Sequence, residues 1–208
     1  MKTSISITTL LIAVLTIAVL TSCNGTHLSL VNVNAPAINY IFDSDGTIPV
    51  TDTADDIELI GMEGTGFLQS RTLPVGETGT VAEGLYGYEY RIDLTEVAGI
   101  LNIVCISSFR IVFGPVESLD FDGNGSNEEV YVVTTGGLGN IAPSSVDVAG
   151  DTLTFNFSPG ICAGNAPGNG DCSFFFGLVS TYPALLVTSD IHAGGTDYNL
   201  EARAPSHP

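Results

Sequence analysis

The sequence predicts an all-β protein that folds as an antiparallel β-sandwich. Apolar and polar residues alternate along several short stretches, which is the pattern of strands with one buried face. Turn-forming residues separate these stretches about every 8 to 12 residues, as in sandwiches and barrels. The composition agrees, because the 208 residues include 24 glycines and 10 prolines. An apolar content of 44% is too high for a disordered chain.

In the first half of the chain, one strand is much clearer than the others. Residues 28–33, "LSLVNV", alternate and predict an early strand. Residues 34–84 are expected to be rich in loops, because glycine and proline interrupt them repeatedly. Residues 88–94, "YEYRIDL", predict a half-buried strand. Its buried face is expected to carry Tyr88, Tyr90, Ile92 and Leu94, and its other face Glu89, Arg91 and Asp93.

The second half of the chain predicts a longer series of strands. Alternate residues in 101–113 are apolar, which places Cys105 toward the core. The stretch "VYVVT", residues 130–134, is apolar on both faces and is expected to be central in its sheet. Residues 94–101 offer the only expected helical turn. Further strands are predicted at 152–157, 173–180, 184–189 and 198–204, which completes one immunoglobulin-like or jelly-roll-like sandwich domain over residues 23–208.

Residues 1–22 have the pattern of an export signal: a positive charge at Lys2 and then a short apolar run. The next residues, "LTSC" at 20–23, resemble the lipobox of bacterial lipoproteins. This resemblance implies that Cys23 is acylated and becomes the mature N-terminus. Acyl chains would then hold the protein at a membrane without a spanning helix. We therefore expect an exported lipoprotein of the cell envelope, on the periplasmic side or at the cell surface.

The charge of the chain narrows the range of partners. It has 23 acidic residues against 5 lysines and arginines, a formal net charge of −18. Phosphate backbones would be repelled, so nucleic acid is not an expected partner. A surface protein or a glycan remains compatible with this charge.

Three cysteines besides Cys23 are available for a disulfide in an oxidising compartment. Cys162 and Cys172 bracket a short glycine-rich loop, and we expect these two to pair. The alternative is a bond between Cys105 and Cys162 across the core, which leaves Cys172 free.

The stretch "DFDGNGSNE", residues 120–128, is the strongest candidate for a site. Calcium takes six to eight oxygen ligands, and a loop with oxygen-bearing side chains at alternate positions supplies them. Gly123 and Gly125 allow the backbone to curl around a cation. The expected ligands are Asp120, Asp122, Asn124, Ser126 and Glu128, and the alternative is a polar turn without a metal.

This stretch resembles the D-x-D-G-x-G-x-x-D calcium hairpin of integrin-type propeller blades, with Glu128 in place of the last aspartate. That hairpin also joins β-strands. The resemblance implies a calcium loop, and because the motif occurs once it does not imply a propeller.

Catalytic patterns are weak. His192 has Ser189 and Asp190 nearby, but neighbours on a strand point to opposite faces, and there is no nucleophile elbow. The expected function is therefore a non-catalytic envelope lipoprotein, a calcium-stabilised β-module for surface binding or structure. The alternative is an extracytoplasmic hydrolase or an accessory carbohydrate-binding domain that uses acidic residues. Its candidate carboxylates are Glu83, Glu89, Asp93 and Glu96.

Overall fold

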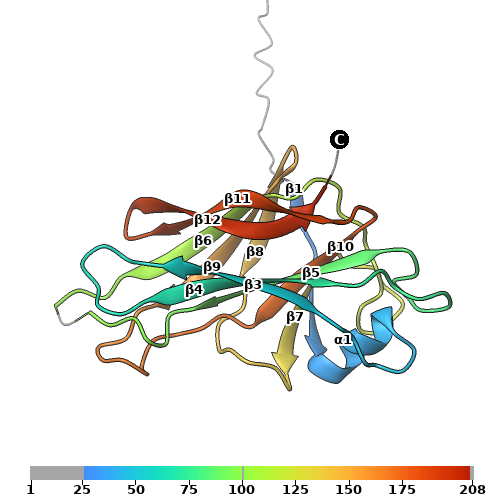
Figure 1. The fold of residues 1–208 in the computed structure, drawn as a ribbon, viewed down its shortest axis with the longest axis horizontal. Coiled ribbons are helices and arrows are strands. Elements are labelled where there is room, and N and C mark those ends of the chain that lie inside the picture. The colour runs from blue at the N-terminus through green and yellow to red at the C-terminus, as the bar shows by residue number, and fades with distance from the viewer. Residues whose placement is uncertain (1–25, 100, 207–208) are drawn as a thin grey trace, which may run out of the picture.

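The computed structural model describes residues 26–99 and 101–206 of the chain. In this part, twelve strands form two six-stranded sheets that pack face to face as an open sandwich (Figure 1). The predicted fold class is confirmed. Residues 1–22 and Cys23, on which the export and acylation predictions depend, lie outside the described residues.

The first sheet is antiparallel throughout and carries both ends of the described chain. Its strands are, in spatial order, β1 (Thr26–Leu28), β8 (Ser145–Ala149), β9 (Thr152–Cys162), β6 (Cys105–Val112), β11 (Ala184–Ala193) and β12 (Thr196–Pro205).

The second sheet has one parallel pair, because β2 runs parallel to β7. The strand predicted to be central is β7, and its burial on both faces is confirmed. It is an interior strand that lies one place from the edge of the sheet, between β2 and β10. In spatial order the strands are β2 (Leu30–Asn34), β7 (Val130–Thr135), β10 (Phe175–Ser180), β5 (Tyr86–Asp93), β4 (Gly66–Leu73) and β3 (Thr51–Ile57).

The strand expected at 28–33 is divided between the two sheets. β1 pairs with β8 in the first sheet, and after Ser29 the chain continues as β2 beside β7 in the second. Local alternation cannot show such a change of sheet, because both pieces keep an extended backbone.

Outside the start of β6, the interior of the sandwich is built from residues that alternation assigns to it. Aromatic rings from both sheets meet at its centre, and the Phe155 ring lies 4.7 Å from Phe176 and 5.8 Å from Phe109. Tyr90 packs 5.2 Å from Phe109 and donates its hydroxyl hydrogen bond to the carbonyl of Arg203 at 2.6 Å. The large apolar area removed from water here is the main stabilising contribution to the fold.

A second apolar layer covers the outer face of the second sheet. Helix α1 (Ala35–Phe42) buries Ile38, Ile41 and Phe42 there, at the end of β7 (Figure 1). Asn34 caps this helix by accepting a hydrogen bond from the Ala37 N–H at 2.9 Å. Residues 34–84, expected to be rich in loops, thus hold α1, β3 and β4 between their turns. Over the described ranges, no helix has the length and apolar character needed to cross a membrane.

This outer layer changes the environment of β5. Its alternation is as predicted, with Tyr88 and Tyr90 inside the sandwich. However, the strand is not half-buried, because Glu89, Arg91 and Asp93 on the other face are only 6%, 8% and 6% exposed. The guanidinium of Arg91 pairs with the Asp93 carboxylate, which offsets part of the cost of burying both charges.

The start of β6 also differs from expectation. Leu101 and Ile103 are 93% and 55% exposed, in a segment that precedes the strand. The register with β9 shifts between Ile106 and Ser108, and this bulge places Ile106 in the core.

The disulfide joins Cys105 to Cys162, so the expected local pair of Cys162 with Cys172 is wrong and the alternative pairing is correct. The reason lies in the register, because Cys105 and Cys162 are directly opposite each other on β6 and β9. The bond does not cross the core, because it joins neighbouring strands of the first sheet. Cys172 is the free cysteine of the described residues. The backbone N–H of Cys172 donates a hydrogen bond to Asn140 Oδ1 at 3.0 Å, which fixes this residue beside the segment that follows β7.

Candidate functional site

The acidic loop lies immediately before β7 and is closed at its base. Leu119 and Glu128 exchange two backbone hydrogen bonds, each 2.9 Å long, so residues 120–127 form a compact excursion. Phe121 points inward from this loop and is 2% exposed, with its ring 4.9 Å from that of Tyr131 on β7. The loop is therefore anchored to the outer apolar layer of the second sheet.

The backbone curls as the two glycines allow. Gly123 and Gly125 have φ values of 76° and 90°, a region that other residues rarely adopt. This curl turns two N–H groups toward one carboxylate: Asn124 N donates to Asp120 Oδ1 at 3.0 Å, and Gly125 N donates to Asp120 Oδ2 at 2.9 Å.

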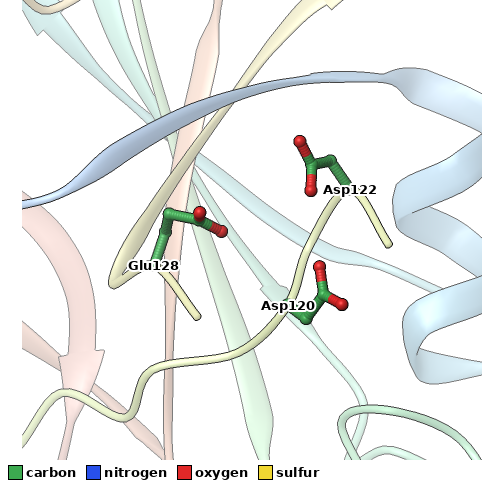
Figure 2. Close-up of side chains that lie close together, drawn as sticks. All are labelled: Asp120, Asp122 and Glu128. Carbon is green, nitrogen blue, oxygen red and sulfur yellow. The ribbon is translucent and has the colours of Figure 1, made fainter. Parts of the chain in front are cut away.

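Three carboxylates converge at this loop. One oxygen from each of Asp120, Asp122 and Glu128 lies within 4.8 Å of the other two. Figure 2 shows the Glu128 side chain directed toward the space beside Asp120 and Asp122. Two oxygens bound to one calcium at 2.3–2.6 Å are at most about 5 Å apart, so this spacing is compatible with a shared ion.

Glu128 gives the cluster a feature that a surface turn would not need. The residue is 9% exposed, and its Oε2 atom is buried without a hydrogen-bond partner. Burial raises the pKa of Glu128, and the nearby Asp122 and Asp120 carboxylates raise it further. A buried carboxylate oxygen without a donor is costly, and a cation between the three groups would remove that cost.

The other two expected ligands take different positions. Asn124 Oδ1 accepts a hydrogen bond from Ser126 N at 2.8 Å, and its amide donates to Asp122 Oδ2 at 2.9 Å. The Asn124 side chain thus stabilises the turn and orients Asp122. Ser126 is exposed.

The structure does not bring His192, Ser189 and Asp190 together as a catalytic group, because each of the three has a different partner. His192 Nδ1 lies 2.7 Å from Asp197 Oδ1 on the exposed surface of the hairpin between β11 and β12. Asp190 instead pairs with Arg110 at 2.9 Å, and the Ser189 hydroxyl donates to the carbonyl of Leu200 at 3.2 Å.

Sequence reasoning missed a polar row on the outer face of the second sheet. Tyr131, Gly177, Glu89, Arg71 and Asp52 are successive cross-strand partners on β7, β10, β5, β4 and β3. The Tyr131 ring crosses Gly177, where an added Cβ would lie 2.5 Å from the phenol. The Tyr131 hydroxyl donates a hydrogen bond to Glu89 Oε1 at 3.3 Å. No local pattern could have found this row, because its members come from five separate strands.

Glu89 is the titratable centre of the row. Burial raises its pKa to about 7, although the Arg71 charge and the Tyr131 hydrogen bond oppose that rise. Arg71 Nη1 lies 3.8 Å from Glu89 Oε2, and Arg71 Nε lies 2.7 Å from Asp52 Oδ1. Among the four carboxylates of the hydrolase alternative, Glu89 and Asp93 share the outer face of β5.

Fold and site together describe an open β-sandwich with an anionic loop at the start of the interior strand β7. No family model, curated protein or solved structure matches the chain.

Proposed function

We propose that this protein is a non-catalytic, calcium-stabilised β-module, exported and held at the membrane of the cell envelope by an acyl group on Cys23. The observation that carries the calcium part is the buried, unpartnered Oε2 of Glu128 beside Asp120 and Asp122. The role that follows is surface binding or structure, with a surface protein or glycan as partner.

Calcium would act on the fold through β7. The loop is closed by the pairing of Leu119 with Glu128, and β7 begins two residues later as an interior strand of the second sheet, between β2 and β10. Bridging the three carboxylates would remove their mutual repulsion in the native state alone. A ligand that binds only the native state stabilises it by RT ln(1 + [L]/Kd).

The calcium proposal is tested by thermal unfolding of the purified full-length chain with increasing calcium. At about one hundred times the dissociation constant the gain is about 2.7 kcal/mol, which corresponds to a rise in Tm of several degrees. Asp122→Ala should lose most of this rise. Asp45→Ala is the matched control, because Asp45 is an exposed aspartate in another aspartate and glycine turn, and it should keep the rise.

Magnesium should substitute poorly, because its small octahedral shell resists so many protein oxygens. An unchanged Tm in millimolar calcium, or an equal shift in Asp122→Ala, would show that the loop is only a turn.

The anchor is tested separately in living cells. The pattern of residues 1–23 leads us to expect that labelled palmitate enters the wild-type protein and is absent from Cys23→Ala. Cys172→Ala is the control for labelling at another thiol and should be labelled normally. Equal labelling of wild type and Cys23→Ala would contradict the acyl anchor without affecting the calcium proposal.

A further inference from the structure

A cavity of about 550 Å³ lies on the outer face of the second sheet. It is open to solvent and is bounded by that face, by α1, and by residues 46–50 and 136–138, which precede β3 and follow β7. Small-molecule pockets have volumes of about 300–1,000 Å³. The wall is mainly apolar and includes Pro36, Ile38, Ile48, Val133 and Phe175.

The rim of this cavity gathers large apolar side chains that are exposed. Tyr40, Val50 and Leu138 are 59%, 42% and 58% exposed, and each comes from a different one of the enclosing segments. The Tyr40 ring is packed against Gly46, where an added Cβ would lie 2.9 Å from it. Apolar side chains that converge from separate segments on one opening indicate a binding surface.

The floor of the cavity is polar and is formed by Arg71 and Glu89 of the polar row. The guanidinium carbon of Arg71 lies 4.0 Å from the centre of the Phe175 ring, which fixes the orientation of the group. Arg71 is paired with Asp52 on one side and with Glu89 on the other. The Arg71 charge is therefore already compensated by Asp52, which lies closer to it than Glu89 does.

This compensation decides which head group fits. A charged ligand would have to compete with the partly buried pairs that Arg71 makes with Asp52 and Glu89, and it would pay its own desolvation at this site. A hydroxyl group both donates and accepts hydrogen bonds, so it can bond to the Glu89 carboxyl in either protonation state and accept from the Arg71 guanidinium without displacing Asp52.

We propose that this cavity binds a small neutral molecule with an aliphatic body and a hydroxyl head group. The body lies against the apolar wall and rim, and the hydroxyl group lies at the Arg71–Glu89 pair. The acidic loop and Cys23 contribute nothing to the cavity, so this proposal does not depend on calcium binding or on acylation.

The test is photolabelling of the purified full-length chain with an octanol that carries a diazirine, followed by mass spectrometry of the labelled peptides. Labels should concentrate on α1 and on residues 46–50 and 136–138. Leu138→Asp places a carboxylate at the rim and should lower labelling of these segments about tenfold, a loss of about 1.4 kcal/mol in binding. Leu186→Asp alters a leucine that is 49% exposed on β11 of the other sheet, and it should label as the wild type does.

Competition identifies the head group. Unmodified octanol should protect the cavity at a lower concentration than octanoate or octylamine. Better protection by octanoate would show that Arg71 is available to an anion, and better protection by octylamine would show that Glu89 is available to a cation. Either result would overturn the proposed ligand class, and labels spread evenly over the surface would overturn the site. Unchanged Tm values of both variants should accompany the expected result.

Discussion

At the scale of single residues, the informative positions are those whose burial conflicts with their chemistry. Glu128 and Glu89 are both carboxylates that are at least nine-tenths buried, but their surroundings differ. Glu128 faces two aspartates and has an oxygen without a donor, whereas Glu89 receives a hydrogen bond from Tyr131 and the field of Arg71. The charged neighbours of Glu128 are anionic, whereas Glu89 also has the cation Arg71 beside it. Of the two, only Glu128 therefore belongs to a candidate cation site.

The pKa of Glu89 predicts how stability depends on pH. In the unfolded chain this carboxyl has its ordinary pKa of 4.5, and in the native state burial raises the pKa to about 7. Between these values the native state binds more protons, so the free energy of unfolding falls as the pH rises and then levels off above pH 7. One pKa unit corresponds to about 1.4 kcal/mol, so the decline amounts to roughly 3 kcal/mol.

Glu89→Gln removes this titration. Measured by denaturant unfolding, the variant should gain stability relative to the wild type as the pH rises from 4.5 to 7. Glu201→Gln, at an exposed position on β12, is the control and should show no such gain. A constant difference between Glu89→Gln and the wild type over this range would mean that Glu89 is not the group responsible.

At the scale of elements, the register of β6 with β9 decides the covalent structure. Cys105 and Cys162 are cross-strand partners that are separated by 57 positions in the sequence. In the chain-entropy model, closing a loop of this length stabilises the native state by about 4 kcal/mol. The disulfide therefore reinforces the pairing of the two strands where β6 begins and β9 ends.

Replacement of the two bonded cysteines tests this register. Cys105→Ser combined with Cys162→Ser should lower the free energy of unfolding by about 4 kcal/mol, measured in denaturant without reductant. Cys172→Ser should have little effect, since Cys172 is outside the bond. A non-reduced peptide that joins Cys162 to Cys172 would contradict the register.

At the scale of the whole molecule, the two sheets are covered unequally. One core lies between the sheets, and a second lies under α1 and the loops on the outer face of the second sheet. The acidic loop and the cavity both adjoin this second layer. Phe121 of the loop is part of its apolar cluster, and so is Phe175, which lines the cavity. Loops carry function more often than the strands that position them, and this layer is where the loops of this chain collect.

The sequence alone determined the fold class, the inward faces of the principal strands, the burial of β7 on both faces and the carboxylate pattern of residues 120–128. These follow from local periodicity and spacing, which act within a few residues. Only the tertiary structure decided the partner of Cys162, the division of the first strand between two sheets, the burial of Glu89 and the polar row that leads to Asp52. Each of these depends on which strands become neighbours, and that choice is made by the packing of segments distant in the chain.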